Sequence, residues 1–316
     1  MSFRKHLESQ GKSKSTVKHY TSYILDFISY LDADGTEVEN TTAKDVLAYL
    51  NLLQKRGHEN STRSTRLNVI KQFMNWQLAL GHRADNPITH LKIRGIKQQK
   101  LYPILDKQQL EQIYNQYQTP KEDDPNKNKN WFTTYKLAKQ RNKAILSLMI
   151  HQGLTTPEIA KLTVNDLKLK AGKMYVAGSR KSNERTLELK SHQIIELMEY
   201  QYTTRKELLN YQEDQKTDLL FLAVPSAGKQ KAAGGGNLQI WKSLTKEIKA
   251  QYNQAEGISF INFKQVRTSV ITHWLKQYNL RQVQDMAGHR YVSSTEAYLV
   301  NNTEDLQKDV DQYHPF

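Results

Sequence analysis

Apolar residues recur at spacings of three and four through the first third of the chain, and this periodicity limits that part to helices. Thr42 followed by Asp45 resembles a capping box and opens the second of three expected helices. The expected inward-facing residues are Val17, Tyr20, Ile24, Phe27, Ile28, Leu31, Val46, Leu50, Leu53, Leu67, Ile70, Met74 and Leu78. We therefore predict a compact helical bundle over residues 1–95.

The rest of the chain adds a small β component to a mainly α fold. Two short alternating runs at residues 173–177 and 185–189 are joined by a turn of Gly, Ser and Asn, a pattern typical of a hairpin. A further buried strand is expected at Leu219–Leu222. We predict a linker over residues 96–105, then an α+β domain with a small antiparallel sheet over residues 106–316.

The charge balance points to a polyanionic partner. The chain has 46 Lys and Arg against 32 Asp and Glu, a net charge of +14. Residues 1–100 hold 16 of the basic and 9 of the acidic residues, so about a third of the chain carries half of the excess charge. Arg63, Arg66 and Lys71 are expected on the outer face of the third helix, where they could neutralise phosphates. A merely solvated face is the alternative, and binding to ribosomes or membrane surfaces would also use such charge.

Several classes of protein are excluded or disfavoured by what the sequence lacks. Cysteine is absent, which rules out disulfides and thiolate metal sites. No apolar run approaches the ~18 residues of a membrane span, and the start of the chain lacks the apolar core of a signal peptide. We expect a cytoplasmic protein, or a nuclear one in a eukaryote, with no metal, no cofactor and no membrane partner.

The C-terminal part contains a constellation that packing alone does not require. Lys264 precedes Arg267 by three residues, Gly288 precedes His289, and Tyr298 follows His289 by nine residues. Taken singly, these are usually a solvated helix face, a helix stop and a packed tyrosine. Taken together, in this order near the end of a basic chain, they resemble the signature of the tyrosine recombinases, the phage-integrase family of DNA strand-exchange enzymes.

The resemblance implies attack on a DNA phosphodiester by Tyr298, which displaces a 5′-hydroxyl and leaves a 3′-phosphotyrosine. Tyrosine has an unperturbed pKa of about 10, so the reaction needs a nearby cation or base. The planar fork of Arg267 matches the non-bridging oxygens. His289 is expected to donate a hydrogen bond to the phosphate or to shuttle the proton of the nucleophile. Lys264 stands where most family members have histidine.

The hairpin turn carries a second candidate site. In the family this turn holds a lysine that protonates the leaving 5′-oxygen, and Lys181 is the corresponding residue here. Arg180 is the alternative, since the length of the turn leaves the register open, and it is also a candidate DNA contact. Lysine suits a general acid better, because arginine is hardly ever deprotonated. A charged hairpin tip without a catalytic role remains the ordinary interpretation.

One family residue is missing. Gly153, Leu154 and Glu158 resemble the first catalytic box of the family, but Thr155 occupies the position of its arginine. We expect a neighbouring cation to replace that arginine, with Arg180 and Arg185 as the first candidates. Arg141 is a weaker one, because fourteen helical residues at ~1.5 Å each would place it about 21 Å away.

The leading hypothesis is a metal-independent, site-specific recombinase that acts on double-stranded DNA as a synaptic tetramer. It would integrate, excise or invert a mobile element or a similar segment. A recombinase-derived DNA-binding protein, impaired in cleavage by Thr155, is the main alternative. A type IB-like nicking and closing enzyme is a third.

Overall fold

The structure, a computed structural model, describes residues 2–95, 102–121, 123–180, 182–225, 229–232, 237–255 and 259–299. The chain divides into two compact units, Met1–Lys100 and Leu101–Phe316. Lys181 and part of the expected linker lie outside the described residues. Among the helices that are described, none combines the length and apolar character that crossing a membrane requires.

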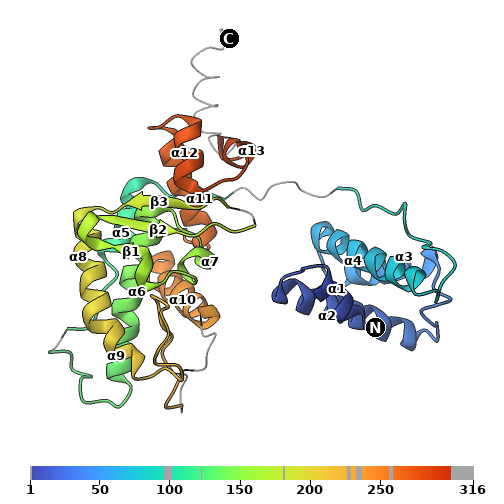
Figure 1. The fold of residues 1–316 in the computed structure, drawn as a ribbon, viewed down its shortest axis with the longest axis horizontal. Helices are drawn as coiled ribbons and strands as arrows, with labels where there is room; N and C mark the ends of the chain where they lie inside the picture. Colours follow the sequence, from blue (N-terminus) through green and yellow to red (C-terminus); the bar gives the residue numbers. More distant parts are fainter. Residues whose placement is uncertain are drawn as a thin grey trace, which may run out of the picture. The chain divides into compact units, whose positions relative to one another are not determined.

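The first unit is the expected helical bundle (Figure 1). Its helices are α1 (Phe3–Ser9), α2 (Lys14–Ala33), α3 (Ala43–Lys55) and α4 (Asn60–Ala79). The predicted capping box is present at the start of α3, where the Asp45 carboxylate accepts hydrogen bonds from the Thr42 amide at 2.8 Å and hydroxyl at 2.7 Å. Leu78 was expected inward but is 40% exposed. Gln77 is buried in its place and contacts His82 Nδ1 at 2.7 Å.

The second unit is mainly helical. Its helices are α5 (Lys107–Asn115), α6 (Phe132–Gln152), α7 (Thr156–Ile159), α8 (Ser191–Glu199), α9 (Arg205–Leu209), α10 (Asn237–Ala255), α11 (Phe263–Leu275), α12 (Leu280–Ala287) and α13 (Ser293–Glu296), with a π-helical turn at Tyr200–Thr204 and 3₁₀ turns at Val164–Asp166 and Leu169–Ala171. Asp106 caps α5, since its carboxylate accepts a hydrogen bond from the Gln109 amide at 2.7 Å.

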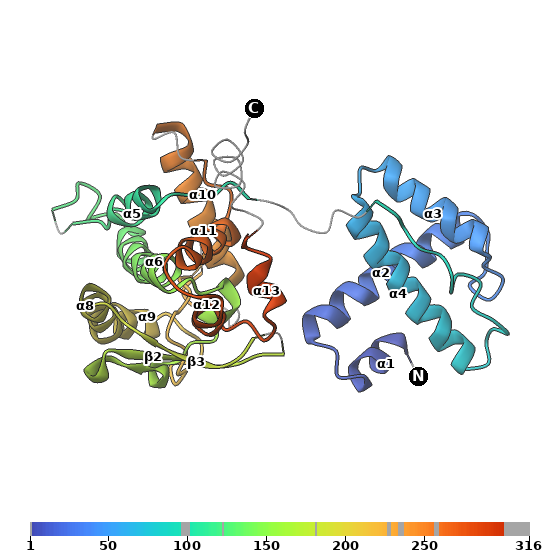
Figure 2. The same cartoon turned by 90° about the horizontal axis from the view of Figure 1, so that it is seen from above.

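Helix α6 lies at the centre of this unit. Its residues Ile145 and Leu148 are fully buried, and the helix packs against α5, α8 and α11. Figure 2, which looks down α6, shows these helices around it and the sheet to one side. Helix α6 ends at Gly153, which has a positive φ of 58° and adopts the left-handed conformation usual for glycine at a helix C-terminus.

The small sheet is antiparallel, with β1 (Leu167–Lys168), β2 (Lys173–Val176) and β3 (Arg185–Glu188) in that order. Val176 lies opposite Arg185, so the predicted hairpin is confirmed. Its tip lies against the end of α12: the Asn183 amide donates to Gly288 O at 2.9 Å, and Arg290 Nη2 donates to Ser179 O at 3.2 Å.

The prediction of a strand at Leu219–Leu222 is wrong. The segment is buried from Leu220 to Leu222, but it makes only an isolated bridge to Thr163 within the described residues. Side chains take the carbonyls that a neighbouring strand would use. Arg205 donates to Leu219 O at 2.9 Å, the Tyr200 hydroxyl to Leu220 O at 3.0 Å, and Arg141 to Leu222 O at 2.9 Å.

Candidate active site

Arg267 is buried at the junction of two helix ends. Its guanidinium donates to the carbonyl of Gly153, which ends α6, and to that of Ala287, which ends α12, at 2.7 Å to the latter. The last carbonyls of a helix carry partial negative charge and lack partners within the helix, so a cation suits both. Burial lowers the pKa of Arg267, while Glu158 and Tyr298 counteract the shift. These two hydrogen bonds therefore set the direction in which the guanidinium of Arg267 points.

His289 follows Gly288, which ends α12 with a φ of 68°. Its Nε2 lies 3.3 Å from Arg267 Nη2, and its Nδ1 lies 2.9 Å from Thr295 Oγ1. A guanidinium can only donate, so Nε2 is the acceptor and Nδ1 carries the proton. Burial, together with the charges of Arg267 and Arg185, lowers the pKa of His289 to about 4. The imidazole is neutral at neutral pH.

Tyr298 follows the short helix α13 and lies over the same junction. Its ring stacks on that of His289, with centroids 5.6 Å apart and planes 12° from parallel. The ring also packs against the apolar cluster of Ile271, Val283 and Ala287. In Figure 1, α11, α12 and α13 lie together beside β3, which is how residues distant in sequence come to share one site. The structure thus brings together three of the predicted catalytic residues.

The other two predicted catalytic residues are placed less fully. Lys264 lies on α11 one turn before Arg267, is exposed, and has its Nζ 5.6 Å from the centre of the Tyr102 ring. Lys181 lies outside the described residues. Its neighbour Ser182 forms a bridge with His289, so the described part of the hairpin tip reaches the site. Arg180, on the same hairpin, is exposed.

Thr155, at the position of the missing arginine, caps α7. The Glu158 carboxylate accepts from the Thr155 amide and hydroxyl, both at 2.8 Å. The same carboxylate pairs with Arg185 Nη1 at 2.7 Å and lies 3.7 Å from Arg267 Nη1. Burial alone would raise the pKa of Glu158, but the hydrogen bond from Arg185 and the two positive charges lower it. Arg141 is buried and bonded to Asn142 and to Leu222 O, away from these residues.

Comparison with known proteins gives the family. The profile of the phage integrase family matches residues 103–305, and that of the phage integrase N-terminal SAM-like domain matches residues 1–80. The chain belongs to the phage integrase family. It is therefore a tyrosine recombinase, one of the site-specific DNA recombinases.

Relatives of this integrase-family chain extend over nearly its whole length. It is 26% identical to tyrosine recombinase XerD of Oceanobacillus iheyensis, covering 97% of this chain and 94% of the relative. It is 23% identical to tyrosine recombinase XerA of Pyrococcus furiosus, covering 98% and 92%.

Solved structures confirm the fold. A lambda integrase dimer bound to a COC′ core site matches with a TM-score of 0.63 at 17% identity, covering 94% of this chain and 74% of that one. A lambda integrase tetramer bound to a Holliday junction matches with a TM-score of 0.62 at 17% identity, covering 93% and 74%. The Tn1549 transposon integrase in complex with a circular intermediate DNA matches with a TM-score of 0.61 at 13% identity, covering 96% and 97%.

In the first unit of this integrase, the residues predicted to contact DNA form hydrogen bonds or an ion pair with other residues of the protein. Arg63 was expected on the outer face of α4, but it is only 8% exposed, because its Nε reaches the Leu50 carbonyl at the C-terminal half of α3 at 3.0 Å. Arg66 pairs with Asp26, and the Lys71 ammonium donates to the carbonyls of Thr89 and Leu91 at 2.8 and 2.6 Å. The prediction that Arg63 points outward is wrong. Contact of Arg63, Arg66 and Lys71 with phosphates stays a prediction.

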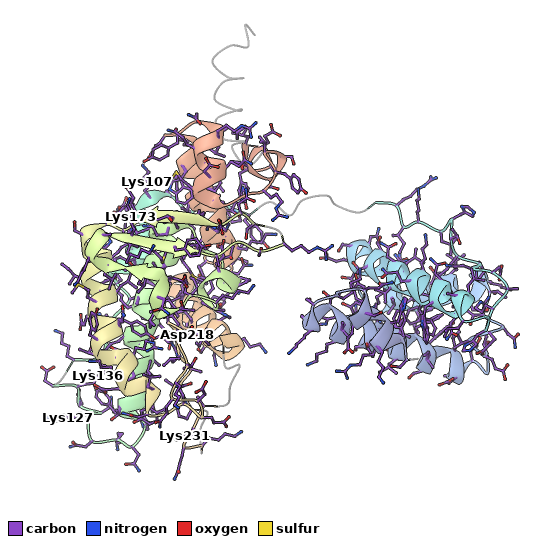
Figure 3. All side chains as sticks on the ribbon, viewed as in Figure 1. Lys107, Lys127, Lys136, Lys173, Asp218 and Lys231 are labelled. Atoms are coloured by element: carbon purple, nitrogen blue, oxygen red, sulfur yellow. The ribbon has the colours of Figure 1, made fainter. Side chains whose placement is uncertain are left out.

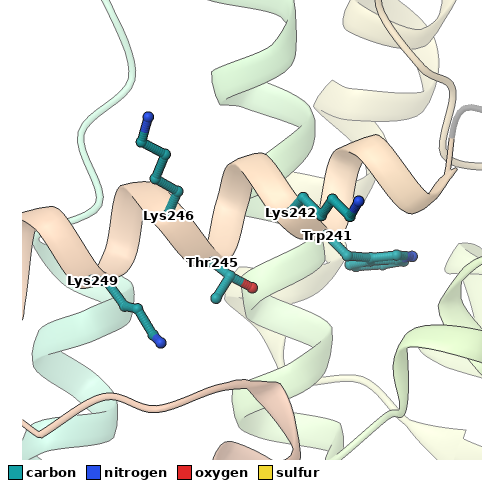
Figure 4. Close-up of a pocket in the computed structure, with 5 residues that line it drawn as sticks. All are labelled: Trp241, Lys242, Thr245, Lys246 and Lys249. Atoms are coloured by element: carbon teal, nitrogen blue, oxygen red, sulfur yellow. The ribbon is translucent and has the colours of Figure 1, made fainter. Parts of the chain in front are cut away.

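A basic face on α10 was not predicted from the sequence. Lys242, Lys246 and Lys249 are exposed on this helix, and with Trp241 and Thr245 they line a pocket of about 420 Å³ (Figure 4). Their spacing of four and three residues places them on one side of the helix, a signal that was present in the sequence. Lysines also lie at the end of the unit remote from α12 and α13, as Lys127, Lys136 and Lys231 show (Figure 3). Basic charge alone therefore does not locate the DNA.

Proposed function

We propose that this recombinase cuts and rejoins DNA strands through a covalent bond between Tyr298 and a 3′-phosphate. The observation that carries the proposal is the meeting of three side chains from separate segments. Arg267 contacts His289 at 3.3 Å, and the Tyr298 ring stacks on His289 at 5.6 Å. A nucleophile, a fixed cation and a neutral imidazole are what phosphodiester transfer by tyrosine requires. A protein that only binds DNA does not require this arrangement.

The proposed cleavage step exchanges one phosphate ester for another. The Tyr298 oxygen bonds to phosphorus while the bond from phosphorus to the 5′-oxygen breaks. The phenol gives its proton to a base, and the leaving oxygen receives one from an acid. Neutral His289 suits the base, and Lys181 suits the acid because lysine releases a proton far more readily than arginine. In the reverse step, the 5′-hydroxyl of another strand attacks the phosphotyrosine and releases the phenol.

Arg267 would stabilise the charge on the non-bridging oxygens. Its side chain is already held by two helix ends, so it does not need to reorganise when charge develops on the phosphate. The pair to Glu158 is longer, at 3.7 Å, and leaves the guanidinium available to a phosphate oxygen. Lys264 adds a second cation on the same helix.

We further propose that residues 1–95 clamp double-stranded DNA, with Arg63, Arg66 and Lys71 as candidate contacts, and that residues 106–316 cut it. Arg180 at the hairpin tip is a fourth candidate contact. A lambda integrase is a tetramer on a Holliday junction, and we propose the same assembly on two duplexes here. We place the activity in the cytoplasm.

Covalent capture tests the proposed function. Purified protein is incubated with fragments of the genome that encodes it, denatured, and the DNA that remains attached to protein is sequenced. We expect fragments of one or a few sites, and a duplex of such a site, nicked near the cleavage point, should trap the 3′-adduct. If no DNA is attached and specific binding persists, the non-cleaving alternative is correct.

The basic face of α10 should contact the phosphate backbone. Each neutralised phosphate contributes about 0.9 to the slope of log affinity against log salt, so changing Lys242, Lys246 and Lys249 to Gln should reduce that slope by up to about 2.7. Fluorescence anisotropy at several salt concentrations measures it. The matched control changes Lys127, Lys136 and Lys231, which lie at the end of the unit remote from α12 and α13. Equal slopes for the two triple variants would contradict this assignment.

A further inference from the structure

Arg185 is a buried arginine with spare hydrogen-bonding capacity. It begins β3, its side chain is 5% exposed, and its Nη1 donates to Glu158 Oε1 at 2.7 Å. Its Nε and Nη2 are also buried, and neither has a hydrogen-bond partner among the described residues. Buried donors are rarely left unpaired, so such a group calls for a functional explanation.

The buried cluster carries more positive than negative charge. Glu158 is shared between Arg185 and Arg267, since its two oxygens lie 2.7 Å and 3.7 Å from the two guanidinium groups. The remaining contacts of Glu158 are with the neutral Thr155. His289 is neutral as well. Two guanidiniums and one carboxylate leave one positive charge within the described site, and a buried charge is unfavourable unless an anion pairs with it.

Arg185 also lies directly against the turn that presents His289. A Cβ atom on Gly288 would come within 2.4 Å of Arg185 Nη1 and 3.0 Å of its Cζ. On the same turn, Gly288 O accepts from the Asn183 amide at 2.9 Å. The guanidinium therefore touches α7 through Glu158 and the end of α12 through Gly288, while its own backbone belongs to the hairpin.

We propose that Arg185 is a positioning residue for DNA cleavage, which holds Glu158 and the Gly288–His289 turn in place and provides the positive charge that Thr155 does not. The inference rests on the proposed function. The anion that completes the cluster is the phosphodiester, whose single negative charge matches the excess. Arg180, the other hairpin candidate, is exposed and does not belong to the buried cluster.

The test compares Arg185→Met, Arg185→Lys and the double variant Thr155→Arg/Arg185→Met. Single-turnover formation of the covalent adduct is measured on a nicked duplex at saturating protein. We expect Arg185→Met to be about 10–100-fold slower, by analogy with residues that orient the ligands of a metal ion, with little change in DNA affinity. Arg185→Lys should lie between it and wild type. The double variant should recover much of the lost rate, since it returns a guanidinium to position 155.

Lys173→Met is the matched control, because it removes an exposed positive charge from the same sheet. Thermal melting of each variant identifies any loss of folding. If Arg185→Met forms the adduct at the wild-type rate, or if the double variant is no faster than Arg185→Met, the inference about Arg185 is wrong and the proposed function still stands. A wild type that forms no adduct overturns the proposed function and this inference with it.

A second readout separates charge from structure. The groups facing His289 are Arg267 on α11, Arg185 on β3, Glu158 on α7, and Thr295 and Tyr298 in and after α13. The pKa of His289 is lowered to about 4 by burial first and then by Arg267 and Arg185. An NMR titration of His289 should therefore show a higher pKa in Arg185→Met and an unchanged one in Arg185→Lys. An equal pKa in Arg185→Met and wild type would show that the charge does not reach the site.

Discussion

We expect Tyr298→Phe to form no covalent adduct with a nicked suicide duplex, while its affinity for the site stays within a few fold of wild type. The change removes only the attacking oxygen. The aromatic ring that stacks on His289 and packs on Ile271 and Val283 remains, so the fold of this region should persist. A denaturing gel of protein and labelled DNA reads out the adduct, and anisotropy reads out binding.

Tyr291→Phe is the control for this prediction. Tyr291 lies in the turn between α12 and α13 and is 68% exposed, outside the cluster of Arg267 and His289. It should form the adduct at the wild-type rate. An adduct that persists in Tyr298→Phe and disappears in Tyr291→Phe would move the nucleophile to Tyr291.

The second large effect should come from Arg267→Lys, with cleavage slower by about 10²–10³, the usual cost of losing a donor to a developing oxyanion. Lysine keeps the charge but cannot reach the carbonyls of Gly153 and Ala287 and still offer a planar fork to phosphate. The melting temperature should fall too, because each buried carbonyl left without a donor costs about 1–3 kcal/mol. Single-turnover cleavage and calorimetry measure the two effects.

Arg4→Lys is the matched control, since Arg4 is an exposed arginine on α1, outside the site. It makes the same substitution, which leaves the net charge of the protein unchanged in both variants, and it should leave cleavage and melting unchanged. An Arg267→Lys variant that cleaves at nearly the wild-type rate would remove Arg267 from the phosphate site.

Local features were predictable because their causes are local. The capping box at Thr42 needs only residues three positions apart, and the hairpin needs only two alternating runs and a turn. The order of Arg267, His289 and Tyr298 indicated a shared site, and the structure shows how the two helix ends assemble it.

What the sequence could not reveal depends on long side chains that reach distant partners. Arg63 bonds to a carbonyl thirteen residues away and Arg185 to a carboxylate twenty-seven residues away, so periodicity along one helix or strand does not report their burial. The Leu219–Leu222 segment failed for the same reason, because arginine and tyrosine side chains took its carbonyls. The α10 lysines were visible as a periodic set but did not differ locally from other surface lysines.

The attachment of Arg267 to two helix ends links activity to the integrity of the fold. Arg267 is at once the proposed phosphate ligand and a cross-link between the ends of α6 and α12. If α12 frays, Arg267 loses an anchor, and His289 and Tyr298 move away with the departing helix. A partly unfolded copy therefore loses its proposed cation, imidazole and nucleophile in one event.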